Sequence, residues 1–128
     1  MIWCVFDRDG NTNAMLSKAK QMAIKEGYQI AFSNPSFEVW FLLHFNNQTT
    51  PVENCEAAIK LLKKKGRLEQ YEKNKEVYEQ LKPLQEAAID RAKKRVAALQ
   101  AEHTEILSRE SNPVTTIAEL VEYLNSKQ

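Results

Sequence analysis

The chain has 128 residues, of which 43% are apolar and 27% charged, and a formal net charge of +1 at pH 7. This length suits one ordinary domain with a buried core, and the near-zero charge confines any basic binding surface to a local patch. Its longest strongly apolar stretch, 39–45, is far shorter than the roughly 20 residues that cross a bilayer, and no signal peptide is seen.

The two cysteines, Cys4 and Cys55, do not have the spacing of a metal-binding motif. Their number and placement indicate a reducing compartment rather than a disulfide framework. We therefore expect a soluble cytoplasmic protein without a membrane anchor.

The first elements predict a strand–helix–strand unit. The apolar run 2–6 is typical of a strand buried on both faces. Apolar residues then recur at helical spacing over about 14–26, and Gly27 follows where a helix C-cap glycine belongs. Residues 28–32 predict a second strand, and the length of the connection suits a right-handed parallel crossover.

Helices are predicted for most of the remaining chain. Asn34-Pro35, a capping asparagine followed by proline at the first helical position, predicts a helix through "SFEVWFLLHF" that is buried because it is apolar nearly all round. The composition of 53–101 favours further helices, with interruptions near Gly66 and Pro83.

The last helix is predicted to start after Asn112-Pro113, with Thr116 and Glu119 as a capping box. No third strong strand pattern follows the first two, so the predicted parallel sheet would have only edge strands and is not expected to stand alone. Because Met1 directly precedes the first strand, we expect either a partner chain that completes the sheet or a fragment of a longer α/β domain.

Two aspartates follow the first strand. In a parallel sheet ligands bind outside the carboxyl ends of the strands, where Asp7 and Asp9 are placed. Two carboxylates in this spacing suit Mg²⁺, which takes oxygen ligands and keeps waters that substrate phosphates can replace. The alternative is that one aspartate caps the loop or the next helix while the other is merely solvated, and the spacing leaves both interpretations open.

Glu38 favours the metal hypothesis. It is the only acidic residue of the apolar helix, and the first turn of that helix is predicted to point toward Asp7 and Asp9. An ionised group in apolar surroundings is costly unless it is paired or coordinates a metal. Stabilisation by the helix dipole is the alternative explanation.

Other polar residues have simpler interpretations. His44 is expected to be packed and hydrogen-bonded, His103 to be at the surface, and Ser33 to serve a turn or cap rather than act as a nucleophile. The basic clusters within 63–67 and 91–95 could contact phosphates, but glutamates surround them and solvated helix faces are favoured.

The stretch "VFDRDGNTN" resembles the first motif of haloacid-dehalogenase-type phosphatases, in which the first aspartate is a nucleophile and the second an acid/base. Ser33 could imitate their second motif. That family also needs a later acidic pair, and the only other aspartate, Asp90, falls in a Lys/Arg-rich helix. This family remains a minor alternative.

A second resemblance extends over nearly the whole chain. "WCVFDRD", "AFSNPSFEVWFLLHF", "AAIDRAKK" and "NPVTTIAELVEYL" together resemble the RloB family, a TOPRIM-type group linked to restriction loci and phage defence. The block "SNPSFEVWFLLHF" is the most specific. The resemblance implies an incomplete TOPRIM/Rossmann-like α/β core in 1–50 and a helical subdomain in 51–128 that packs on it.

The same resemblance implies a nuclease of DNA or RNA in which Asp7 and Asp9 bind Mg²⁺ or Mn²⁺, with Glu38 as a further acidic position. It also implies an AAA/ABC-class ATPase partner that resembles RloA. TOPRIM domains carry a further glutamate after an earlier strand, for which this chain has no counterpart. A non-catalytic binding or regulatory subunit is therefore the alternative, and the exposed sheet edge makes a homo-oligomer plausible.

Overall fold

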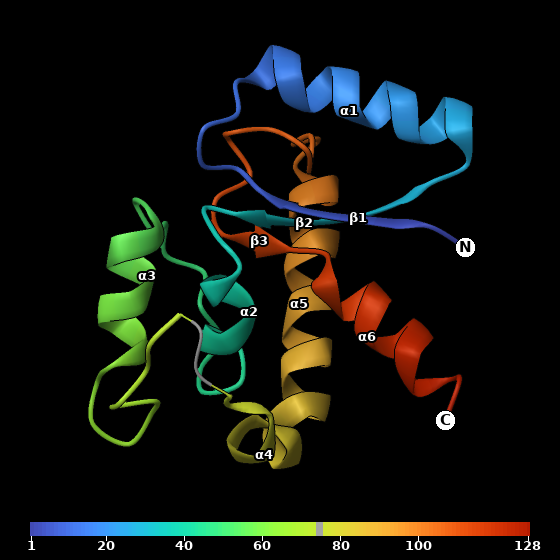
Figure 1. The fold of residues 1–128 in the computed structure, drawn as a ribbon. Coiled ribbons are helices and arrows are strands. Elements are labelled where there is room, and N and C mark those ends of the chain that lie inside the picture. Colours follow the sequence, from blue (N-terminus) through green and yellow to red (C-terminus); the bar gives the residue numbers. More distant parts are fainter. Residues whose placement is uncertain (74–75) are drawn as a thin grey trace.

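The computed structural model of the chain describes residues 1–73 and 76–128, and in this part it is a mixed α/β structure with a three-stranded sheet (Figure 1). The elements are, in chain order, β1 (Trp3–Asp7), α1 (Asn13–Glu26), β2 (Gln29–Asn34), α2 (Glu38–Leu42), α3 (Cys55–Leu62), α4 (Tyr78–Leu81), the 3-10 helix η1 (Lys82–Leu84), α5 (Gln85–Ala101), β3 (Val114–Thr115) and α6 (Ile117–Asn125). None of the helices in the described ranges is long and apolar enough to cross a bilayer.

The predicted strand–helix–strand unit is confirmed. β1 and β2 are parallel, and Asp7 lies opposite Ser33 at their carboxyl ends. The Thr12 side chain caps the start of α1, and Gly27 ends the helix with a φ of 73°, a left-handed conformation that glycine adopts without a Cβ penalty. The carboxyl ends of both strands point toward the side of the molecule where α2 and α3 lie (Figure 1).

β1 is not buried on both faces, contrary to the prediction. It lies at an edge of the described sheet, whose strand order is β1-β2-β3, and Val5 in its middle is 52% exposed. The central strand β2 has the fully buried residues instead, Ala31 and Phe32. An edge strand has a neighbour on one side only, so its apolar residues remain partly open to solvent.

The third strand lies where the sequence predicts the start of the last helix. β3 pairs antiparallel with the end of β2, with Thr115 opposite Ser33 and Val114 opposite Asn34. The prediction of a sheet with two strands is therefore wrong. A strand of two residues has no room for an alternating pattern, and only its pairing with β2 defines it.

The two predicted helix caps, Thr116 and Asn34, are also wrong. Their side chains form hydrogen bonds with a strand and with a loop instead of with the helix ends. The Thr116 hydroxyl accepts a hydrogen bond from the Phe32 backbone N–H at 2.8 Å, so α6 begins without a side-chain cap and the capping box with Glu119 does not form. The Asn34 amide donates to the Ser108 carbonyl at 3.0 Å, and α2 begins only at Glu38.

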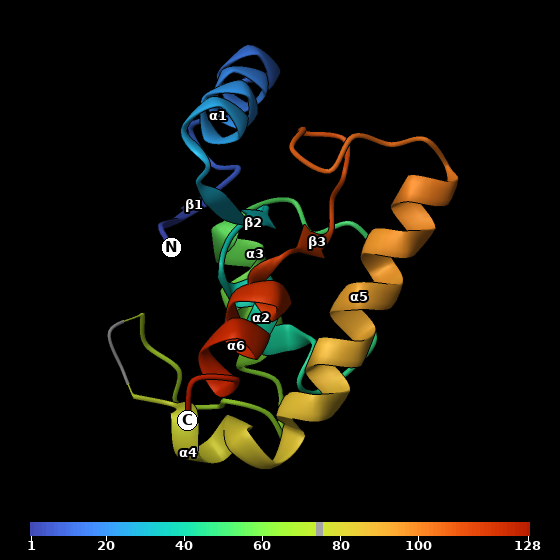
Figure 2. The same cartoon turned by 90° about the vertical axis from the view of Figure 1, so that its right-hand side faces the viewer.

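Each face of β2 contributes to a separate apolar cluster. Phe32 packs on one side with Leu16 of α1, and Ala31 packs on the other side with buried residues of α2, α5 and α6. Both views place α1 on one side of the sheet and α2 and α6 on the other (Figures 1 and 2). A third cluster joins α2 and α3 to buried residues between 68 and 81.

The region 53–101 is less helical than predicted. The described residues between α3 and α4, 63–73 and 76–77, belong to no helix, and Pro83 lies in η1, directly before α5. α5 ends at Ala101, as predicted, and Figure 2 shows it running along one side of the molecule. The segment before α4 contributes apolar and polar groups to the candidate site.

Candidate functional site at the carboxyl edge of the sheet

Asp7 is the last residue of β1, and its carboxylate lies beside the start of α2. Partial burial raises the pKa of Asp7. A hydrogen bond from the Phe37 backbone and the charge of Lys73 act in the opposite direction, while the negative charges of Glu38 and Asp9 raise the pKa further. The fold therefore brings Asp7, Glu38 and Asp9 within electrostatic range of one another.

Asp9 is held by the residue between the two aspartates. The Arg8 guanidinium donates to the Asp9 carboxylate at 2.9 Å and to the Glu53 carbonyl at 2.9 Å, and Arg8 is only 9% exposed. The Arg8 backbone N–H also bonds the Ser33 carbonyl, which extends the contact between the β1 and β2 ends. Arg8 thus fixes the loop that carries Asp9, a role that the sequence pattern did not indicate.

Glu38 is the most enclosed acidic residue of the region. It is 2% exposed, and four side-chain donors surround its carboxylate. The Tyr71 hydroxyl donates at 2.6 Å and the Lys73 ammonium lies 3.4 Å away, both at Oε2. The Ser36 hydroxyl donates at 2.9 Å and the Cys55 thiol at 3.4 Å, both at Oε1.

These donors keep Glu38 ionised. Burial acts to raise the pKa of Glu38, but the hydrogen bonds from Tyr71 and Ser36 and the charge of Lys73 outweigh it, and the pKa is lowered. Burial together with the Glu38 carboxylate raises the pKa of Tyr71 well above its ordinary value, so Tyr71 remains a donor. Tyr71 and Glu38 thus form a buried, charge-assisted hydrogen bond that connects a loop to the start of α2.

The residues fit a divalent cation in part. Asp7 and Asp9 carry carboxylate oxygens of the kind that Mg²⁺ prefers, and one oxygen of Asp9 already accepts the hydrogen bond from Arg8. Both oxygens of Glu38 are already occupied by donors. Among the described residues no three His, Cys, Asp or Glu side chains are grouped so that they could hold a metal ion together, and the predicted site of Asp7, Asp9 and Glu38 stays a prediction.

Other residues considered in the sequence lie outside this site. His44 is buried, its Nδ1–H donates to the Trp40 carbonyl at 2.9 Å, and burial lowers its pKa, which confirms the packed interpretation. His103 is exposed, as predicted. The prediction that Ser33 serves a turn or cap is wrong: Ser33 is buried within β2 and shares a hydrogen bond with the Thr115 hydroxyl at 2.8 Å.

The basic cluster of α5 is engaged within the molecule. Arg91 donates to the Leu43 carbonyl at 2.7 Å and Arg95 to the Pro113 carbonyl at 2.8 Å. Lys93 and Lys94 form ion pairs with acidic side chains of α6 and of α5 itself. This cluster therefore connects α5 to the residues after α2, to the residue before β3 and to α6. The lysines at 63–65 of the other basic cluster are exposed.

Sequence reasoning identified the acidic residues but missed the donors around Glu38. Ser36 lies two residues before Glu38 and could be suspected from that spacing, whereas Tyr71 is 33 residues away and reaches it only through the fold. No local pattern marks such a contact.

A family model described as RloB-like protein matches residues 1–124. The comparisons with curated proteins and with solved structures found no match. The matched range contains the strand end with Asp7 and Asp9, the helix start with Glu38, and the loop with Tyr71 and Lys73. Because the match covers nearly the whole chain, this protein belongs to the RloB-like family.

Proposed function

We propose that the chain is a metal-dependent nuclease component with a TOPRIM-like core, acting in phage defence or a restriction-associated system. The observation that carries the proposal is the position of Asp7 at the carboxyl end of a parallel strand, with Asp9 next to it in the loop and Glu38 at the start of the facing helix. This edge is where α/β sheets bind their ligands. Membership of the RloB-like family supports the same assignment.

Asp7 and Asp9 are the proposed ligands of Mg²⁺ or Mn²⁺. A bound ion of this kind polarises a phosphodiester and stabilises the leaving oxygen. In this proposal Arg8 orients Asp9, and Glu38 positions Lys73, whose charge acts on Asp7. Lys73, 57% exposed at its side chain, supplies a positive charge to an incoming phosphate.

The test is cleavage of labelled single-stranded and duplex DNA and RNA in the presence of Mg²⁺ or Mn²⁺ and with excess chelator. We expect metal-dependent cleavage by the natural chain and none by Asp7→Asn or Asp9→Asn. Asp90→Asn is a matched control, because Asp90 is exposed on α5 and pairs with Lys94. Equal cleavage by all four proteins would exclude the assignment of the aspartates.

A second candidate is a non-catalytic subunit of a complex with an AAA/ABC-class ATPase. It is favoured by the full hydrogen-bonding of Glu38 and by the lack, among the described side chains, of three grouped metal-ligating residues. This candidate predicts that the purified chain cleaves none of the four nucleic acids, and that tagged chain expressed in its own host co-elutes with an AAA/ABC-class ATPase. Metal-dependent cleavage that Asp7→Asn abolishes would rule it out.

A further inference from the structure

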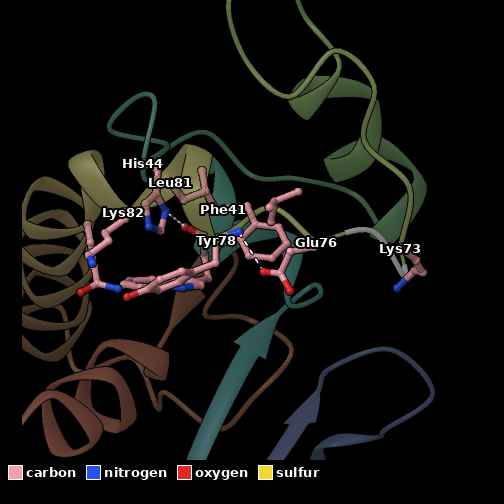
Figure 3. A pocket seen from close by; sticks show the side chains of 10 residues that line it. Phe41, His44, Lys73, Glu76, Tyr78, Leu81 and Lys82 are labelled. Atoms are coloured by element: carbon pink, nitrogen blue, oxygen red, sulfur yellow. Dashed lines mark hydrogen bonds between the residues drawn. The ribbon is translucent and has the colours of Figure 1, made fainter. Parts of the chain in front are cut away.

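A pocket of about 380 Å³ lies between the end of α2 and the start of α4. Its volume is in the range of about 300–1,000 Å³ that is typical of small-molecule sites. Aromatic side chains of both helices line it, including Phe41 and Tyr78, and Figure 3 shows Lys82 and Lys73 toward opposite ends. The proposed chemistry at the aspartates uses none of these aromatic residues.

We propose that this pocket binds a base of single-stranded nucleic acid, with Tyr78 as its stacking platform. This inference rests on the proposed function and specifies its substrate class. Tyr78 is 46% exposed although it lines the pocket, so part of its side chain is open to a ligand. Stacking on an aromatic ring accepts any base, since every base has a π-face.

Two lysines, Lys73 and Lys82, and one glutamate, Glu76, line the pocket, so positive side chains prevail there. The Lys82 ammonium lies 5.7 Å from the centre of the Tyr78 ring, and Lys73 lines the other end of the pocket. Aromatic rings beside basic side chains are the usual means by which proteins hold single strands, the rings for bases and the cations for phosphates. Glu76 and Gln85, which also line the pocket, supply hydrogen-bonding groups for a base edge.

Two residues that line the pocket contact residues at the carboxylate edge of the sheet. Lys73 lies 3.4 Å from the Glu38 carboxylate, and the Phe41 ring packs edge-on against the Tyr71 ring, with centroids 5.8 Å apart. Tyr71 in turn bonds Glu38. In the proposed complex a strand with one base on Tyr78 continues along the pocket toward Lys73, whose charge also acts on Asp7.

The experiment measures binding of a fluorescein-labelled single-stranded oligonucleotide by anisotropy, in excess chelator so that metal-dependent cleavage does not occur. Tyr78→Ala is expected to weaken binding roughly 5- to 150-fold, the loss of one stacked base. Tyr78→Phe keeps the ring and should bind as the natural chain does. Tyr28→Ala is the matched control, because Tyr28 is exposed but lies before β2, away from the pocket.

Lysine variants test the phosphate contacts in the same assay. Lys82→Gln should reduce the slope of log affinity against log salt by about 0.7, the value for one phosphate of a single strand. Lys25→Gln, an exposed position on α1, should leave the slope unchanged.

The pocket assignment is overturned if Tyr78→Ala binds as tightly as the natural chain, or if a duplex of the same sequence binds as well as the single strand. Binding that depends on Tyr78 in a chain that never cleaves would refute the nuclease proposal and leave the pocket standing. Cleavage that depends on Asp7 but not on Tyr78 would refute the pocket alone.

Discussion

At the scale of single residues, the buried Glu38 carboxylate is stabilised mainly by hydrogen bonds from neutral side chains rather than by a close ion pair. Its strongest partner is the Tyr71 hydroxyl at 2.6 Å, and Lys73 remains half-exposed at 3.4 Å. Burying an ionised group is costly unless such donors surround it. The sequence correctly indicated that this glutamate needed a special environment, but a metal was only one of the ways to provide it.

Tyr71→Phe removes one donor and little volume from this site. A hydrogen bond to a charged group contributes about 1.5–3 kcal/mol, so we expect the free energy of unfolding at pH 7 to fall by about that amount. Urea unfolding measures the change. Tyr28→Phe is the control, because the exposed Tyr28 ring lies away from Glu38 and should leave the unfolding free energy unchanged.

The pH dependence of the same variant has a definite sign. The pKa of Glu38 is lowered in the folded state, so its ionisation stabilises the fold above the ordinary glutamate pKa, and this stability is lost as the pH falls through the lowered value. In the Tyr71→Phe variant the free energy of unfolding should therefore decrease less steeply as the pH is lowered below the ordinary glutamate pKa. An unchanged acid limb of the stability curve would contradict the assigned role of Tyr71.

At the scale of elements, β3 and the start of α6 depend on contacts that the sequence does not display. Thr116 and Glu119 have the spacing of a capping box, yet the Thr116 hydroxyl bonds the Phe32 backbone of β2. The Thr116 hydroxyl could accept from the nearby Glu119 backbone N–H, as in a capping box, or from the Phe32 backbone N–H of β2. In the structure it accepts from Phe32. β1, α1 and β2 were predictable because their signals are local: an apolar run, helical spacing and a C-cap glycine.

Thr116→Val tests this connection between β2 and α6. Without the hydroxyl, the N–H of the fully buried Phe32 loses its acceptor, which should lower the free energy of unfolding by about 1–3 kcal/mol. Thr116→Ser retains the hydroxyl and should recover most of this loss. Equal denaturant midpoints for the two variants would show that the hydrogen bond contributes nothing.

At the scale of the whole molecule, the sequence predicted the β1–α1–β2 unit, the family and the acidic residues at one edge of the sheet. It did not predict the segment between α3 and α4, which brings Tyr71 and Lys73 to Glu38 and lines the aromatic pocket. The composition of that segment favours a helix, but its described residues 63–73 and 76–77 form none, and Leu68, Tyr71 and Val77 pack instead in the apolar cluster shared with α2 and α3. The predicted helical half is thus also the source of the groups that complete the site.

The assignment of Asp7 and Asp9 as metal ligands is tested most directly by the effect of Mg²⁺ or Mn²⁺ on thermal unfolding, which needs no substrate. At about 100 times its dissociation constant, an ion that binds only the folded chain adds about 2.7 kcal/mol of stability. We predict a higher unfolding midpoint for the natural chain and for Asp90→Asn, and no change for Asp7→Asn or Asp9→Asn. The proposed metal site would be contradicted if neither ion raised the unfolding midpoint of the natural chain. It would also be contradicted if the ion raised the midpoint of Asp7→Asn as much as that of the natural chain.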